Sequence, residues 1–486
     1  MAIPAESFFL DPAYEGTLQQ QIQQLVTEGI LSGRLLAGER MPSSRKLADR
    51  LGVSRITVTL AYTELVSNDY LASKGRSGYF VSANAPRPPK FEVQRRSGED
   101  GVDWGRAIGQ RFSSYESLAR PRDWRRYKYP FIYGQADATL FDHQNWRLCA
   151  LKALGQRDFD AMTADYYERD DEKLIEFITR HILPRRGIAA RPEEVLLTLG
   201  AQNALWMAAQ VLLTQRRKAA IENPCYPGLR EILEQTRCKL VPVDVDQDGL
   251  PPEALPRDVD VVFSTASHHC PTNATMPVDR RRALLERATK DGFIIVEDDY
   301  EFEMSFANAP SPALKSLDCT GAVVYIGSFS KSVFPGLRLG YLVGSEAFIR
   351  EARALRALVL RHPPGHIQRT AAYFLSLGHY DAQIRRMGAA YAERRAVMDG
   401  AIREFGLEMA GKETFGGSSF WMKAPAGVNT TDLALGLRDQ GVLIEPGRAF
   451  FAPQDENNSF YRLAYSSIPT GRIPEGVDLI ARALRG

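Results

Sequence analysis

The chain has 486 residues, more than one ordinary domain contains, and this length fits two or three domains. Hydrophobic residues make up 44% and charged residues 25%, which is typical of globular proteins in water. The net charge of +2 is too small to indicate a partner. Because no apolar run could span a bilayer and the first residues lack the features of a signal peptide, we expect a cytoplasmic protein without membrane contact.

The first 82 residues predict three short helices and a hairpin. Apolar residues recur at helical spacing between residues 18 and 30. A second helix is expected after residues 42–44, up to a break at Gly52, and a third begins at Ser54, a suitable N-cap. Two strands are expected at residues 70–72 and 79–81, around a turn that contains two glycines.

Residues 42–65, PSSRKLADRLGVSRITVTLAYTEL, have the pattern of a helix-turn-helix. A helix fits the major groove of DNA, where its N-terminal side chains meet base edges. Between residues 40 and 76, basic side chains outnumber acidic ones seven to three. The expected DNA-binding residues are Ser54, Arg55 and Thr57 on the third helix, Ser44 and Arg45 at the supporting helix, and Lys74 and Arg76 on the hairpin. On pattern alone, a small helical cap with ordinary surface arginines remains the alternative.

The rest of the chain predicts a linker followed by an α/β domain. Residues 83–127 are basic, contain several prolines and lack an apolar period, as linkers do. From residue 128 onward, strand-like runs alternate with amphipathic helices; such runs occur at 195–199, 219–221, 259–263, 293–296 and 323–326. This alternation favours a mostly parallel sheet. The predicted domains are therefore 10–82, 83–127 and 128–486.

The strongest chemical signal is Lys331, which follows Ser328 and Ser330 directly after the strand-like run 323–326. A lysine amine can form a Schiff base with an aldehyde, and serine hydroxyls can bond a phosphate. The spacing S-x-x-K is weak evidence by itself, because most such lysines lie on the surface. The five cysteines form no C-x-x-C pair and no metal-ligand spacing, so we expect reduced thiols and no metal site.

Three further segments strengthen the cofactor hypothesis. Asp298 ends a buried strand and could hold the proton of a pyridine ring nitrogen, while Tyr300 could donate to the ring oxygen. Ala201 and Gln202 begin a helix after a strand and a glycine, where backbone N–H groups favour phosphate. Arg338 supplies a second cation that can bind phosphate bidentately.

These segments resemble two known families. The helix-turn-helix and its wing resemble the GntR family in P-S-S-R-x-L-A-x-x-L-G-V-S-R-x-T-V-x-x-A-Y-x-x-L. Most of residues 128–486 resembles the fold type I, aspartate-aminotransferase-like enzymes, which use pyridoxal 5′-phosphate. By that resemblance, Tyr226 stacks on the cofactor ring and Arg462 binds a carboxylate. A packed core aromatic and a strand-edge surface charge are the alternative interpretations of these two residues.

The combination resembles the MocR/GabR regulators over essentially the whole chain. It implies a winged helix-turn-helix joined to an aminotransferase-like domain, a head-to-tail homodimer, and binding to double-stranded promoter DNA. A small amino effector, such as an amino acid or an amino sulfonate, would displace Lys331, form an external aldimine and bias domain closure. An active aminotransferase with a DNA-binding module remains an alternative. A second alternative is a regulator that has lost its cofactor, although the presence of Lys331, Asp298, Tyr300 and Arg338 argues against it.

Two places depart from the enzyme pattern. Cys270 stands where aminotransferases carry the asparagine that bonds the ring oxygen, which argues against efficient transamination and for sensing. Residues 166–172 replace a glycine-containing turn, so Tyr166 or Tyr167 is the candidate for reaching the neighbouring subunit's phosphate site. The effector stays open among amino acids, taurine-like sulfonates, γ-aminobutyrate and diamino acids, as do the operator and the sign of regulation.

Overall fold

The computed structural model describes residues 2–86, 101–113, 121–135, 137–165, 167–306, 311–411 and 416–485. The chain divides into two compact units, residues 1–110 and 111–486. Among the described helices, none combines the length and the apolar character needed to cross a membrane.

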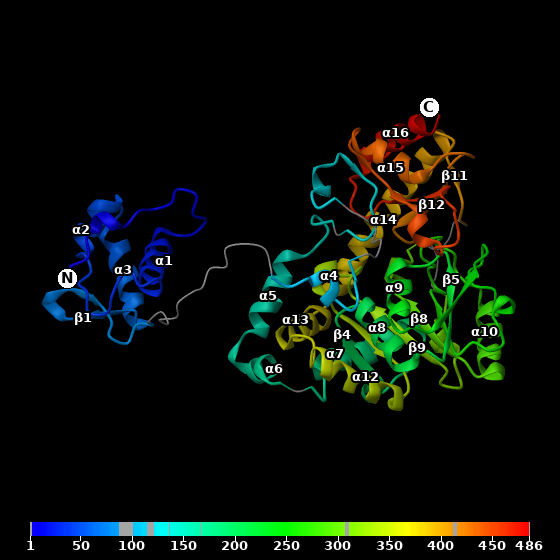
Figure 1. Ribbon diagram of the computed structural model, residues 1–486, viewed down its shortest axis with the longest axis horizontal. Coiled ribbons are helices and arrows are strands. Elements are labelled where there is room, and N and C mark those ends of the chain that lie inside the picture. The colour runs from blue at the N-terminus through cyan, green and yellow to red at the C-terminus, as the bar shows by residue number, and fades with distance from the viewer. Residues whose placement is uncertain are drawn as a thin grey trace. The chain divides into compact units, whose positions relative to one another are not determined.

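Three helices and an antiparallel hairpin form the N-terminal fold: α1 (Leu18–Leu31), α2 (Ser44–Leu51), α3 (Arg55–Ser67), β1 (Leu71–Ser73) and β2 (Tyr79–Val81) (Figure 1). Thr17, Ser43 and Ser54 each cap a helix by accepting a hydrogen bond from a backbone N–H group. The predicted helices and hairpin are therefore confirmed, with the first strand one residue later than expected.

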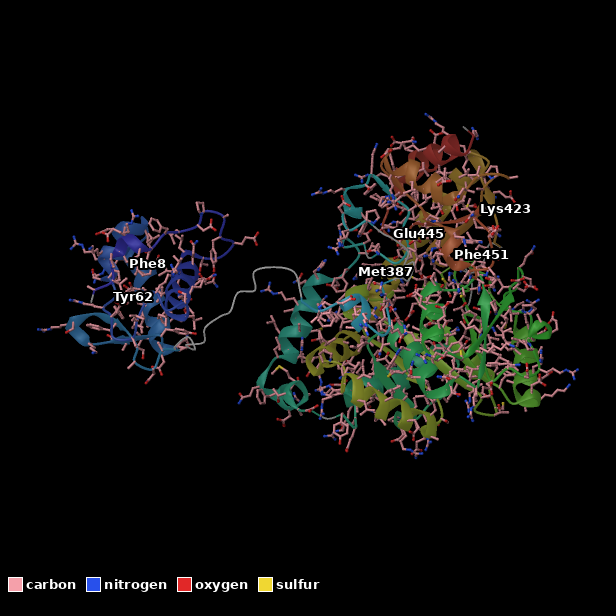
Figure 2. The ribbon with its side chains drawn as sticks, in the orientation of Figure 1. Phe8, Tyr62, Met387, Lys423, Glu445 and Phe451 are labelled. Atoms are coloured by element: carbon pink, nitrogen blue, oxygen red, sulfur yellow. The ribbon has the colours of Figure 1, made fainter. Side chains whose placement is uncertain are left out.

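The core of this unit lies between the three helices and the hairpin. Tyr62 is fully buried, and its hydroxyl donates to the carbonyl of Pro42 at 3.1 Å, which ties α3 to the turn before α2 (Figure 2). Ile3 and Phe8, which precede the residues used in the sequence prediction, also belong to this core because their apolar side chains pack against it. The short helix α4 (Trp104–Ala107) lies within the predicted linker.

A seven-stranded sheet dominates the second unit, in the order β4-β10-β9-β8-β7-β5-β6. The strands are β4 (Val195–Thr198), β5 (Lys218–Asn223), β6 (Lys239–Asp244), β7 (Val261–Ser264), β8 (Ile294–Asp299), β9 (Val323–Ser328) and β10 (Gly340–Val343). Strand β10 runs antiparallel to both of its neighbours, β4 and β9, and the other pairs of adjacent strands in this sheet are parallel. The predicted mostly parallel sheet is thus confirmed, while β6 and β10 were not foreseen.

Helices pack around this sheet (Figure 1): α5 (His143–Ala153), α6 (Phe159–Thr163), α7 (Glu172–Phe177), α8 (Ala201–Leu212), α9 (Pro227–Gln235), α10 (Val278–Asp291), α11 (Leu314–Leu317), α12 (Glu346–Val359) and α13 (Gly365–Ser376). The carboxyl ends of the parallel strands meet at one edge of the sheet. Tyr226, Cys270, Tyr300 and Lys331 all follow those strand ends, so the topology gathers them.

A smaller antiparallel sheet completes the second unit, in the order β11-β12-β15-β14. The helices and strands of this C-terminal part of the chain are α14 (His379–Glu404), β11 (Glu408–Met409), β12 (Ser419–Lys423), α15 (Thr430–Arg438), β13 (Val442–Leu443), β14 (Glu445–Pro446), β15 (Phe460–Ala464) and α16 (Ile473–Arg485). The early strand β3 (Tyr129–Pro130) pairs with β13 in parallel. Residues near 130 therefore lie beside the C-terminal segments that carry Arg462.

Candidate functional site

A cavity of about 290 Å³ lies at the carboxyl edge of the large sheet. Its lining includes every residue that the sequence singled out for cofactor or effector: Ala201, Gln202, Tyr226, Asp298, Tyr300, Ser328, Lys331, Arg338 and Arg462. Strands of the large sheet position most of them, and β15 of the small sheet adds Arg462. The structure thus brings residues from distant parts of the chain into one pocket.

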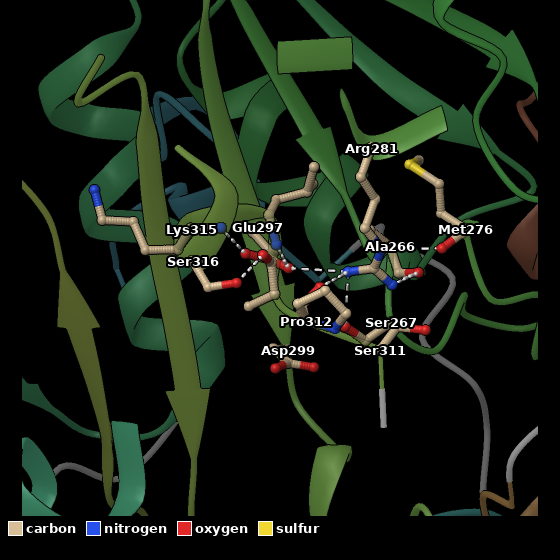
Figure 3. A network of polar contacts seen from close by, with 12 residues as sticks. Ala266, Ser267, Met276, Arg281, Glu297, Asp299, Ser311, Pro312, Lys315 and Ser316 are labelled. Carbon is tan, nitrogen blue, oxygen red and sulfur yellow. Dashed lines mark hydrogen bonds and ion pairs between the residues drawn. The ribbon is translucent and has the colours of Figure 1, made fainter. Parts of the chain in front are cut away.

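Strand β8 carries three consecutive buried acids, Glu297, Asp298 and Asp299. Alternate side chains of a strand point to opposite faces, so Glu297 and Asp299 share one face. There, Arg186 Nε donates to Asp299 at 2.7 Å. Glu297 accepts two backbone N–H bonds and lies 3.8 Å from Arg281 (Figure 3). Asp298 points the other way and lines the cavity.

Among the described residues, the buried Oδ1 atom of Asp298 has no hydrogen-bond partner. Burial and the neighbouring acids Asp299 and Glu222 raise its pKa to about 7, although Lys331 acts in the opposite direction. A buried acceptor without a partner calls for a donor. The donor that fits is a protonated ring nitrogen inside the cavity.

The opposite end of the cavity combines a helix N-terminus with a cation. Helix α8 begins after Gly200, whose φ is +83°. A Cβ on Gly200 would lie 3.3 Å from the guanidinium of Arg338, so glycine lets this cation lie against the helix start. Arg338 Nη2 donates to the carbonyl of Leu199 at 3.0 Å. Free N–H groups of a helix start beside an arginine suit a phosphate.

Arg462 is buried, so its interpretation as a surface charge is wrong. Its Nε donates to Glu445 at 2.8 Å, and its Nη1 lies 3.8 Å from Cys270 Sγ. Burial disfavours the charge, but Glu445 more than compensates and raises the pKa of Arg462. Burial also raises the pKa of Cys270 to about 12, so this neighbour stays an uncharged thiol.

Sequence reasoning missed Tyr133, whose ring contacts two of the cations that line the cavity, Lys331 and Arg462. Lys331 Nζ lies 4.2 Å and Arg462 Cζ 4.1 Å from its ring centre, distances typical of cation–π contacts. Its hydroxyl donates to Glu301 Oε2 at 3.0 Å. Burial raises the pKa of Tyr133 well above its ordinary value, which keeps the ring neutral. The one sequence signal near Tyr133 is the glycine that follows it, Gly134.

The predicted DNA-binding residues lie on α2, α3 and the hairpin. Arg45, Arg55, Lys74 and Arg76 are exposed. Arg55 Nε donates to Ser44 Oγ at 3.4 Å, which links the two helices of the motif. Tyr166 lies outside the described residues; Tyr167 is exposed under the guanidinium of Arg361, whose Cζ is 5.1 Å from the ring centre.

Comparison with known proteins supports the two-part organisation. Residues 140–480 match the family of class I and II aminotransferases, and residues 18–81 match the gntR family of bacterial regulatory proteins. The HTH-type transcriptional regulator TauR of Rhodobacter capsulatus is 61% identical over all of both chains. The probable rhizopine catabolism regulatory protein MocR of Rhizobium meliloti is 29% identical, covering 98% of this chain and 95% of that one.

Solved structures share the fold of the second unit. The α-aminoadipate aminotransferase LysN of Thermus thermophilus, complexed with N-(5′-phosphopyridoxyl)-L-leucine, is 25% identical with a TM-score of 0.71 and covers 79% of this chain and 99% of that one. Kynurenine aminotransferase of Pyrococcus horikoshii is 24% identical, with a TM-score of 0.70 over 79% of this chain and 98% of that one.

A winged helix and an aminotransferase fold on one chain define a class of regulator built from an enzyme scaffold. The chain belongs to the MocR-type transcription regulators, which join a gntR-family domain to a class I and II aminotransferase domain. The cofactor of this aminotransferase family is pyridoxal 5′-phosphate, and the cavity fits it. Asp298 offers an unpartnered acceptor, Lys331 an amine, and Arg338 with the start of α8 a phosphate cradle.

Replacing Asp298 with asparagine should change the pH dependence of stability in the cofactor-free protein. Folding raises the pKa of Asp298 from 3.8 to about 7, so between these values the folded chain binds more protons than the unfolded chain, and stability falls as pH rises. Asp298→Asn cannot ionise. Its free energy of unfolding should therefore fall less between about pH 5 and about pH 8, as measured by denaturant titration. If the free energy of unfolding fell equally in the unaltered protein and in Asp298→Asn, the raised pKa of Asp298 would be contradicted.

Gly134→Ala should reduce the amount of cofactor attached to Lys331. Gly134 has a φ of +73°, and an added Cβ would collide with Lys331 Nζ. The strain and the collision both displace the amine. Borohydride reduction followed by mass spectrometry measures the attached cofactor. Gly400→Ala, in a helix with open space around it, is the matched control and should keep full attachment. If Gly134→Ala carried the full amount of cofactor, the close contact between residue 134 and the amine of Lys331 would be refuted.

Proposed function

We propose that the chain is a promoter-binding transcription regulator of the cytoplasm that senses one small amino compound through pyridoxal phosphate on Lys331. The observation that carries the proposal is the cavity, which gathers Lys331, Asp298, Arg338 and Arg462 in a chain that also has a winged helix. The 61% identity with the regulator TauR over the whole chain supports it.

Each residue of the cavity has a defined task in this proposal. Pyridoxal phosphate supplies an aldehyde that links reversibly to primary amines. Lys331 holds that aldehyde, Asp298 holds the proton on the ring nitrogen, and Tyr300 donates to the ring oxygen. Arg338 would hold the phosphate together with three other groups of the cavity wall: the hydroxyl of Ser328 and the backbone N–H groups of Ala201 and Gln202. Tyr226 covers the ring.

The acid-binding end favours an effector with a single negative charge. Arg462 is the cation available to an acid group there, and Glu445 already neutralises part of its charge. A second acid group there would be repelled by the carboxylate of Glu445. We propose a taurine-type amino sulfonate, in keeping with the name of the relative TauR. Its amine would take the place of Lys331 on the aldehyde, and its sulfonate would bind Arg462.

Sensing rather than turnover is the role we propose for this unit, and Cys270 supports it. The thiol is uncharged and buried, and offers only a weak hydrogen bond where aminotransferases carry asparagine. An active aminotransferase with a DNA-binding module is the alternative. Sustained release of a keto or aldehyde product from an amino donor over many turnovers would favour that alternative.

We propose that the effector acts by changing how the two sheets of the second unit close on each other. The effector would touch Arg462 on β15 and the loops of the large sheet at once, so it binds the closed arrangement better. A head-to-tail homodimer, as the resemblance implies, would carry this change to a pair of winged helices.

Two variants test whether sensing and DNA binding reside in different units. Lys331→Ala should lose the visible absorbance of the linked cofactor and every response to effector, yet retain DNA binding. Arg55→Ala should lose DNA binding, because an exposed cation of the reading helix disappears, and retain the absorbance. Gel shifts and absorbance spectra of both variants measure these outcomes. A full effector response in Lys331→Ala would discard the proposal.

Removing the Arg462 charge should abolish recognition of the acid group. Arg462→Met alone leaves Glu445 buried without its cation, so the double variant with Glu445→Gln is the fair test. The affinity for taurine should fall about 10- to 100-fold, the value of a charge-assisted hydrogen bond. The affinity for ethylamine, which lacks the acid, should change little. Absorbance titration measures both, and equal losses for the two amines would count against Arg462 as the acid partner.

A further inference from the structure

The outward face of α3 carries large apolar side chains. The helix buries Val58, Ala61, Tyr62 and Leu65. With about 100° of rotation per residue, Ile56, Leu60 and Thr63 lie on the side directly opposite. Ile56 is 72% exposed and Leu60 50% exposed. The helix that the sequence assigns to the major groove thus presents two alkyl groups, one turn apart, at the centre of its free face.

The hydroxyl groups around this face are already engaged. Ser54 Oγ accepts the backbone N–H of Thr57 at 3.1 Å and lies 2.8 Å from Thr57 Oγ1. The hydroxyls of Thr59 and Thr63 donate to carbonyls four residues earlier, both at 2.9 Å. Two of the side chains that the sequence selected as base readers are therefore engaged: Ser54 caps the helix, and the hydroxyl of Thr57 bonds to that cap. The face offers mainly methyl and methylene groups to a ligand.

Basic side chains are exposed on α2 and at the N-terminal end of α3, namely Arg45, Lys46 and Arg55. Their charges complement the phosphates on either side of a major groove, and phosphate contacts fix a helix there without selecting a sequence. The apolar face then lies against base edges. Among those edges, the apolar feature of the major groove is the 5-methyl group of thymine.

We propose that Ile56, with Leu60 one turn behind it, reads thymine methyl groups in the operator. This inference rests on the proposed DNA-binding function and deepens it by naming the base. Ile56 and Leu60 are about 6 Å apart along the helix axis, close to two base steps of about 3.4 Å. The operator half-site therefore carries one or two thymines whose methyl groups matter more than their hydrogen-bonding edges.

Replacement of thymine by deoxyuridine tests the proposal, because it removes only the methyl group. The full-length protein with its cofactor first selects a site from a random double-stranded DNA library. Each thymine of that site is then replaced singly, and equilibrium affinities are measured at one salt concentration. At one or two positions the replacement should weaken binding about fourfold, the size expected for one buried methyl group.

Variants on the helix assign the effect to its side chains. In Ile56→Ala or Leu60→Ala, thymine and deoxyuridine should bind equally well at the sensitive position. Leu36→Ala, which removes an exposed leucine outside α3, is the matched control and should keep the fourfold difference. Circular dichroism verifies that each variant is folded.

Three results would overturn the proposal in distinguishable ways. If a sequence is selected but no deoxyuridine weakens binding, the thymine reading fails while the regulator proposal stands. If the protein selects no sequence at all, both fail. If Ile56→Ala alters the oligomeric state and leaves the deoxyuridine effect intact, the face contacts protein instead of DNA.

Discussion

The second unit depends on how one buried strand accommodates three neighbouring carboxylates. Burying a charge costs several kcal/mol unless a partner compensates it. Strand alternation sends Glu297 and Asp299 to a face where Arg281 and Arg186 meet them, and Tyr325 also donates to Asp299 at 2.8 Å. Glu297 and Asp299 lie against arginines on that face, and of the three acids it is Asp298 that lines the cavity. A strand in the middle of the sheet thus holds the site's unpartnered acceptor in a fixed place.

The two arginines of the cavity also differ in whether a carboxylate balances their charge. Arg338 lies against the start of α8, and the carbonyl of Leu199 is the protein oxygen that it contacts, so its charge is available to a phosphate. Arg462 is already paired with Glu445. Among the described residues, Arg338 has no such carboxylate partner, so the two cations differ in how strongly they attract an anion. In the proposed function, this difference directs the phosphate to Arg338 and a singly charged acid group to Arg462.

Local signals made much of the fold and the site predictable. The caps Ser43 and Ser54 and the apolar periods of the helices act over a few residues, so the winged helix could be derived from sequence. Lys331 and Asp298 could be found because Asp298 lies at the end of one buried strand and Lys331 follows shortly after another. Tyr133 could not, since its contacts with Lys331 and Arg462 join segments about 200 or more residues apart. Glu445 could not, because its pairing with Arg462 follows only from the register of β14 against β15. Ile56 was missed for a different reason: its importance emerges only once the hydroxyls of Ser54 and Thr57 are seen to be engaged in the cap.

The proposed sensing has a physical basis in the contacts of Tyr133. Its ring lies against Lys331 and Arg462, so the proposed amine-linking group and the proposed acid-binding group share one surface. Its hydroxyl donates to Glu301, which follows β8 of the large sheet, and Glu301 also accepts a bond of 2.5 Å from Ser418, next to β12 of the small sheet. A ligand shifts a conformational balance only through contacts that differ between states. Because these bonds join both sheets beside Lys331, a movement of one sheet against the other alters the surroundings of the linked amine, and a change at that amine acts on the sheets in return.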